Sequence, residues 1–198
     1  MYKKQMIFQK VVCYLVLVAS ALVFVYSLGL VTDLYDSLYI MMPDPTDMSA
    51  NYVAGAEIFY DIQEFNRYLT KAGIILILLA LFMMIMNTHT RRRYYIGNYV
   101  AIALSTVANI AATVWALTNL SSYKEQYLTT VDFESLKMWS EIWKSTYTES
   151  TFWFDAGTWV FGLLLVTTVL LVVNLIWKIS MMNREQKLVQ EGKAAVNG

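Results

Sequence analysis

The chain has 198 residues, of which 58% are hydrophobic, and its 15 basic and 15 acidic residues leave no net charge. Charged residues make up 15% of the chain, against about 25% in a typical globular protein. A soluble core of this size does not need so much apolar material, so the composition favours a membrane protein. The charge balance gives no sign of a nucleic-acid partner. The single cysteine, Cys13, excludes an intramolecular disulfide and paired-cysteine redox chemistry, and we expect it to be a buried thiol.

Four apolar runs predict four transmembrane helices, because a bilayer span needs about 20 apolar residues. Asp, Glu, Lys and Arg occur only at the ends of these runs. The first run has a basic start like a signal peptide, but it is too long to be one, so we expect it to remain as an anchor. The expected spans cover about residues 11–31, 70–87, 96–118 and 157–179. We therefore predict an all-α integral membrane protein, a four-transmembrane-helix bundle that forms a single membrane domain over residues 1–198.

The distribution of basic residues predicts the orientation of the spans. The N-terminus, the short loop 88–95 and the tail 180–198, with Lys178 at its edge, hold 10 of the 15 basic residues, whereas the two long loops hold 13 of the 15 acidic ones. By the positive-inside rule, both termini are then cytoplasmic. We expect a multi-pass protein of a cell membrane, specifically a bacterial plasma membrane. Topology anchors that also contact lipid headgroups are expected at Arg91, Arg92 and Arg93.

The first outside loop, residues 32–70, is expected to contain an amphipathic helix over about residues 54–71. This helix could continue without a break into the second span. The second span is uniformly apolar, and we expect it to be the most lipid-exposed of the four. The apolar residues of the amphipathic helix recur at helical spacing, at Ile58, Phe59, Ile62, Phe65 and Leu69.

The second outside loop, residues 119–156, is expected to contain a helix over about residues 133–147, with Asp132 as its N-cap. Aromatic residues that follow this helix fit the aromatic belt of a membrane boundary. One side of the helix carries Phe133, Leu136, Trp139 (or Met138), Ile142 and Trp143. Exposed aromatic residues of the two loops would form a candidate interface with a partner protein. The candidates are Phe59, Phe65, Trp139, Trp143, Phe152 and Trp153.

The third span is the least lipid-like, because it carries three asparagines and many alanines. Small residues let helices approach closely, and amide side chains can hydrogen-bond between helices. We expect this helix to be the innermost, with its polar face as a packing seam. The alternative is a polar route for a solute along a pore or an oligomer axis. Four positions fall seven residues apart, at Asn98, Ser105, Ala112 and Asn119, with Asn109 beside them and Thr167 and Asn174 as partners in the fourth span.

Several kinds of site are disfavoured. The apolar cores hold no ionisable residue, which weakens a proton-coupled mechanism. His89 is the only histidine and has no companion ligands for a metal, and the segment 44–47 lacks the ligand pattern of a calcium loop. We expect no cofactor and no metal. The polar tail is expected to extend the last helix by only a turn or two.

These observations support three hypotheses of function. The favoured one is a non-enzymatic subunit or accessory component of a membrane complex, whose partners are the lipid bilayer and other membrane protein chains or copies of itself. The second is a homo-oligomeric channel or small-solute transporter, with a polar route along the third span and an acidic vestibule that favours cations. The third is a membrane enzyme acting on lipid, which no motif in the chain supports.

Overall fold

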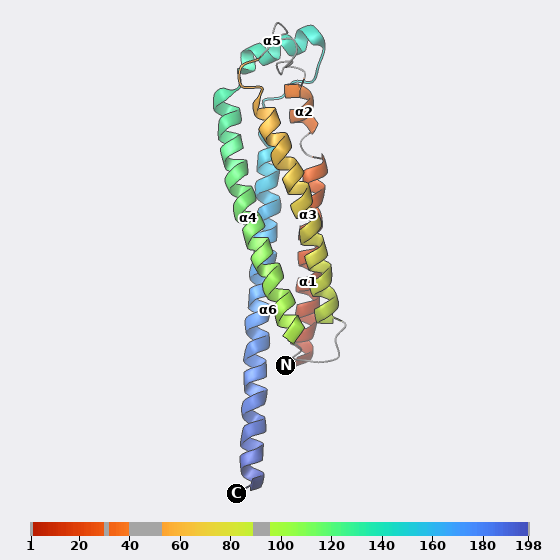
Figure 1. Ribbon diagram of the computed structural model, residues 1–198, viewed down its shortest axis with the longest axis vertical. Helices are drawn as coiled ribbons and strands as arrows, with labels where there is room; N and C mark the ends of the chain where they lie inside the picture. Colours follow the sequence, from red (N-terminus) through yellow and green to blue (C-terminus); the bar gives the residue numbers. More distant parts are fainter. Residues whose placement is uncertain (1, 30–31, 40–52, 89–95, 198) are drawn as a thin grey trace. The chain divides into compact units, whose positions relative to one another are not determined.

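The computed structural model describes residues 2–29, 32–39, 53–88 and 96–197. Within these ranges the chain forms helices and turns and contains no strand (Figure 1). The helices are α1 (Tyr2–Gly29), α2 (Thr32–Tyr39), α3 (Ile58–Thr88), α4 (Ile96–Thr130), α5 (Phe133–Trp143) and α6 (Phe152–Asn197). Four of them, α1, α3, α4 and α6, are long and apolar enough to span a membrane, in agreement with the four predicted spans.

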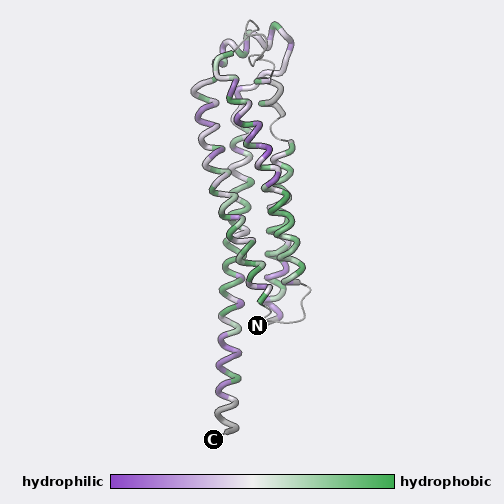
Figure 2. Tube along the Cα trace, viewed as in Figure 1, coloured by the Kyte–Doolittle hydropathy of each residue, from purple (hydrophilic) through white to green (hydrophobic). Residues whose placement is uncertain are grey.

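The long helices extend beyond the predicted spans. The amphipathic segment of the first long loop and the second span form one continuous helix, α3, as expected. α4 continues to Thr130, well past the predicted end at residue 118. α6 reaches Asn197, so the expectation that the tail would leave the helix after a turn or two was wrong. Figure 2 shows that this last part of α6 is largely hydrophilic. Its polar residues are mostly good helix formers, which is why the helix continues.

A turn over residues 54–57 precedes α3, and this is why the helix begins later than the predicted residue 54. Gly55 has a φ of 83°, in the left-handed region that favours glycine. A Cβ atom at this position would lie 2.2 Å from the carbonyl oxygen of Thr130. The adjacent Ala54 carbonyl accepts a hydrogen bond from the Asp132 N–H at 3.0 Å. Backbone contacts therefore join this turn to the segment that enters α5.

The chain divides into two compact units. Unit 1 consists of Met1–Ser20, Leu76–Ala111 and Leu163–Gly198, and unit 2 consists of Ala21–Ile75 and Ala112–Gly162. In unit 1, parts of all four long helices pack around one apolar core. The fully buried residues of that core are Val12, Cys13, Val16, Ala80, Met83, Ala101, Ile102 and Leu171. Cys13 is thus a buried thiol, as predicted.

Unit 2 has an aromatic core. The ring of Tyr26 in α1 stacks on that of Trp153 in α6, with centroids 5.3 Å apart, and the Tyr26 hydroxyl donates to the Trp153 carbonyl at 3.0 Å. Phe65 of α3 contacts Trp115 of α4, with ring centroids 5.0 Å apart. Aromatic pairs of this kind each contribute about 0.5–1.5 kcal/mol beyond the area that they bury. Aromatic residues that the sequence suggested as surface residues therefore fill this interior.

α5 lies in unit 2 and packs against α2, a short helix that the sequence did not predict. Asp132 is the N-cap of α5, as predicted. Its carboxylate accepts hydrogen bonds from the Ser135 backbone N–H at 3.2 Å and from the Ser135 hydroxyl at 2.6 Å. The predicted end at residue 147 was wrong, because Lys144 adopts a left-handed conformation with a φ of 53° and its N–H donates to the Ser140 carbonyl. This C-cap closes the helix at Trp143.

The N-cap predicts a dependence of α5 on pH. The Ser135 hydroxyl and N–H stabilise the charged carboxylate and hold the pKa of Asp132 below its ordinary value of 3.8. The lower pKa belongs to the folded state, so the stabilisation is complete above pH 3.8 and is lost as the pH falls through the folded-state pKa. We expect hydrogen exchange of α5 amides, corrected for intrinsic rates, to accelerate on acidification. The Asp132→Asn variant keeps an N-cap without titrating, so an equally large acceleration in that variant would contradict the assignment.

The four long helices differ in how much of each is buried. Of the most apolar stretch of each helix, 44% of the residues are buried in α1, 28% in α3 and 33% in both α4 and α6. α3 therefore leaves the most surface for lipid. The most buried helix is α1, whereas the sequence had suggested the third span. α1 places Val12, Val16 and Val23 in the interior, while α4 leaves Val107 and Val114 exposed.

Candidate functional site

A buried cluster of polar side chains lies in unit 1, and all four long helices contribute to it. We call it the Lys178 cluster. Each of its members is at most 9% exposed. The members are Gln5 and Gln9 of α1, Asn87 of α3, Asn98 of α4, and Asn174 and Lys178 of α6.

Hydrogen bonds between helices connect the amides of the cluster. The Gln5 Nε2 donates to the Gln9 Oε1 and to the Asn174 Oδ1, both at 3.0 Å. The Gln9 Nε2 donates to the Asn87 backbone carbonyl at 2.8 Å. The Asn87 Nδ2 in turn donates to the Met83 carbonyl at 2.9 Å. α1, α3 and α6 are thereby joined through side-chain amides.

Lys178 carries the formal charge of the cluster, and its side chain is only 5% exposed. Its Nζ lies 3.5 Å from the Asn87 Oδ1 and 5.3 Å from the centroid of the Tyr99 ring. With the Asn98 amide oriented to satisfy both of its neighbours, its oxygen accepts from Nζ at 3.3 Å and its nitrogen donates to the Met86 carbonyl. The described part of the chain places no carboxylate within ion-pair distance of this ammonium.

Burial of an ammonium without a counter-charge is costly, and neutral oxygens and an aromatic face recover part of that cost. For this reason an ionisable residue inside a bundle of spanning helices is a candidate for function. The sequence had placed Lys178 at the edge of a span, as one of the residues that set topology. A usable signal was the four-residue spacing of Gln5 and Gln9 and of Asn174 and Lys178, which puts each pair on one helix face.

The polar residues predicted on the third span divide into two groups. In unit 1, Asn98, Ser105 and Asn109 are buried. The Ser105 hydroxyl donates to the Leu79 carbonyl at 3.5 Å, and the Asn109 Nδ2 donates to the Thr168 Oγ1 at 3.0 Å. These bonds satisfy polar atoms of α4 with groups of α3 and α6.

The other two predicted positions on the third span, Ala112 and Asn119, lie in unit 2 and are half-buried. The Asn119 Nδ2 donates to the Trp115 carbonyl of its own helix at 2.7 Å. An α-helix turns about 20° away from a strict seven-residue repeat with every heptad. The later positions therefore rotate off the face that buries Asn98. In the fourth span, Thr167 is buried and donates to the Leu164 carbonyl within α6 at 2.9 Å.

The candidate interface residues differ in exposure, and three of them are buried, contrary to the prediction. Phe59, Phe65 and Trp153 are 2–4% exposed, because they fill the interior of unit 2 and are not available to a partner. Trp139 is half-buried. Trp143 and Phe152 are 57% and 64% exposed.

α5 exposes a strip of apolar side chains that the sequence assigned differently. Leu136 and Ser140 are the buried residues of this helix. Met138, Ile142 and Trp143 are 50%, 58% and 57% exposed, and we call them the α5 strip. The predicted apolar side had placed Ile142 and Trp143 together with Leu136. The exposed charged residues of the same helix are Glu134, Lys137 and Glu141, with Lys144 at its C-cap.

Some predicted residues lie outside the described part of the chain. These are Arg91, Arg92 and Arg93 and the segment 44–47, together with His89. Within the described residues, no group of three or more His, Cys, Asp or Glu side chains could hold a metal ion. The Lys178 cluster combines a charged group with neutral amides.

Comparisons with protein-family models, with curated proteins and with solved structures gave no match. Two features of the chain itself therefore remain as candidates for function. One is the Lys178 cluster in unit 1, and the other is the α5 strip in unit 2. The first is internal and joins helices, whereas the second is exposed and available for binding.

Proposed function

We propose that the chain is a non-enzymatic component of a membrane complex, and that it binds another membrane protein through the α5 strip. In this proposal both termini lie in the cytoplasm, and α2 and α5 lie on the outer side of a cell membrane. The observation that carries the proposal is the exposure of Met138, Ile142 and Trp143 on a helix outside the four apolar spans.

The composition of this surface supports binding to a protein. Burying a fully exposed large apolar side chain contributes about 1.5–3 kcal/mol. The strip residues are 50–58% exposed, so covering three of them on one helix still supplies the apolar centre of an interface. Tryptophan is enriched among the residues that contribute most to binding. Interfaces commonly surround an apolar centre with a polar rim, and the charged residues of α5 can supply that rim.

The charge of the two long loops argues against the membrane surface as the occupant of the strip. On α5 itself the exposed Glu134 and Glu141 are balanced by Lys137 and Lys144. The two long loops together hold 13 of the 15 acidic residues of the chain. Anionic lipid attracts basic segments and repels acidic ones. A partner protein with an apolar patch is therefore the better fit.

A polar route through the chain has less support. Ser105 and Asn109 form hydrogen bonds with other helices of the same unit, which is what a packing seam requires. The charge of the Lys178 cluster is positive, so a route past it would favour anions over the cations that an acidic vestibule attracts.

Site-specific photocrosslinking in intact cells tests the proposal. A benzophenone side chain at Met138 should crosslink the full chain to one membrane protein and give a single heavier band. Ile142→Glu should abolish this crosslink, because it puts a charge into the apolar centre of the interface. The same complex should survive purification in mild detergent.

A position on the proposed cytoplasmic side provides the control. Gln190 of α6 is exposed, and in this proposal it lies across the membrane from α5, so a benzophenone there should give little or none of the same product. Equal crosslinking from both positions would indicate random collisions. Crosslinks to lipid alone from Met138, together with a monomer in mild detergent, would contradict the proposal.

A further inference from the structure

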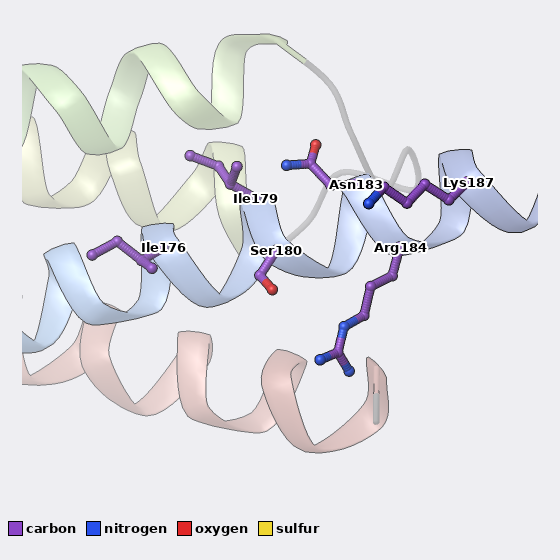
Figure 3. Close-up of a pocket in the computed structure, with 6 residues that line it drawn as sticks. All are labelled: Ile176, Ile179, Ser180, Asn183, Arg184 and Lys187. Carbon is purple, nitrogen blue, oxygen red and sulfur yellow. The ribbon is translucent and has the colours of Figure 1, made fainter.

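A shallow groove of about 440 Å³ follows one face of α6 in unit 1. Figure 3 shows side chains from successive helix turns along it, with an apolar pair at one end and two basic residues at the other. All of the lining residues are exposed. They are Ile176, Ile179, Ser180, Asn183, Arg184 and Lys187.

The basic end of the groove carries two positive charges, at Arg184 and Lys187. Within the described residues, neither Arg184 nor Lys187 forms an ion pair. The acid next to them in sequence, Glu185, does not line the groove. Ser180 and Asn183 add a hydroxyl and an amide on the same face. The groove therefore offers two cations and two neutral hydrogen-bonding groups within about two helix turns.

The apolar end lies directly beside these polar groups. Ile176 is 61% exposed and Ile179 is 38% exposed, on the part of α6 that still belongs to an apolar span. A phosphate or carboxylate free in solution would make no use of these two side chains. A molecule that joins an acyl chain to an anionic headgroup would contact both ends at once.

We propose that this groove is a binding site for an anionic phospholipid. Arg184 and Lys187 contact the phosphate, Ser180 and Asn183 hydrogen-bond to the headgroup, and the acyl chain lies against Ile176 and Ile179. Arg and Lys side chains near the ends of spanning helices are placed to meet headgroups in this way. The site is separate from the α5 strip, so it does not depend on the protein partner proposed above.

Native mass spectrometry of the full chain in detergent tests this site. Phosphatidylglycerol and phosphatidylcholine with identical acyl chains are titrated separately, and we expect one phosphatidylglycerol to be retained at concentrations that leave phosphatidylcholine unbound. The double variant Arg184→Gln/Lys187→Gln should weaken phosphatidylglycerol binding about 25-fold, because each basic residue near an anionic membrane surface contributes a factor of about five. Ile176→Asn should weaken it several-fold with no change of charge.

A second double variant controls for charge alone. Lys3 and Lys4 are exposed residues of α1 in the same unit. The Lys3→Gln/Lys4→Gln variant therefore also removes two positive charges, but from outside the groove. We expect it to change binding less than twofold, and an equal loss in both double variants would overturn the site. Glycerol 3-phosphate, added at the concentration of the lipid, should not displace phosphatidylglycerol. Displacement by it would show that the groove takes a free anion instead.

Discussion

Replacing Gly157 with alanine is expected to destabilise the folded protein by about 2 kcal/mol. A Cβ atom at this position of α6 would lie 2.5 Å from the Tyr26 hydroxyl and 2.7 Å from the Leu120 Cδ1. Both neighbours are buried, and Tyr26 in particular cannot move away easily. Tyr26 is 1% exposed and is held by its hydrogen bond to the Trp153 carbonyl and by its stacking on the Trp153 ring. The added methyl group therefore has to distort the aromatic core of unit 2.

Gly162 provides a matched control on the same helix. A Cβ atom there would meet nothing within 4 Å. The Gly162→Ala substitution makes the same chemical change in α6 and gains helix propensity, so it should be neutral or stabilise by up to about 1 kcal/mol. The free energies of unfolding of the two variants can be compared by denaturant titration in bicelles. Equal stability of the two variants would contradict the close packing of Gly157 against Tyr26.

Local patterns were enough to predict the four spans and the cap of α5. A run of about 20 apolar residues has few alternatives to a membrane helix, and Asp132 precedes a helix that it can cap through its own side chain. The continuity of α3 was also foreseen, because helical spacing extends from Ile58 through Leu69 to the apolar run. Each of these predictions depends on residues that are close together in the chain.

The features that the sequence misplaced depend on contacts between distant segments. Phe59 and Trp153 resemble exposed aromatic residues of a loop, but the tertiary packing of unit 2 buries both. On α5, periodicity alone could not show that Leu136 is buried while Ile142 is exposed, since that choice depends on which side meets the rest of unit 2. The Lys178 cluster likewise requires that α1, α3, α4 and α6 bring their polar residues to one place. No single stretch of sequence contains this information.

Replacing Asn87 with leucine is expected to cost about 3 kcal/mol of unfolding free energy, because it leaves a buried ammonium with fewer acceptors. The Asn87 Oδ1 lies 3.5 Å from the Lys178 Nζ and 3.3 Å from the Gln9 Nε2. Leucine has a similar size but offers no oxygen. The loss should exceed that of an ordinary amide hydrogen bond between membrane helices, which averages about 0.6 kcal/mol. The measurement is a denaturant titration in bicelles.

Lys178→Met should be much milder and should remain within about 1 kcal/mol of the parent protein. Replacing a buried charge by an apolar residue of similar volume removes a desolvation cost together with the contacts that offset it. Lys124 is the matched control for loss of a lysine charge, because it pairs with Asp155 at 2.6 Å while its side chain is 36% exposed. Partly exposed ion pairs of this kind contribute little to the free energy of unfolding. Lys124→Met should therefore also change stability only slightly.

The double variant Asn87→Leu/Lys178→Met separates the charge from simple packing. If the cost of Asn87→Leu comes from a stranded ammonium, removing that ammonium should recover at least about 1 kcal/mol of it, within the range of coupling energies between contacting residues. Asn87→Leu/Lys124→Met should show no such recovery, because Lys124 makes its ion pair in unit 2. If the effects of Asn87→Leu and Lys178→Met are additive, then Asn87 stabilises the protein only through its hydrogen bonds with Gln9 and within α3. The cluster would then be a set of independent hydrogen bonds, and Lys178 would not be its centre.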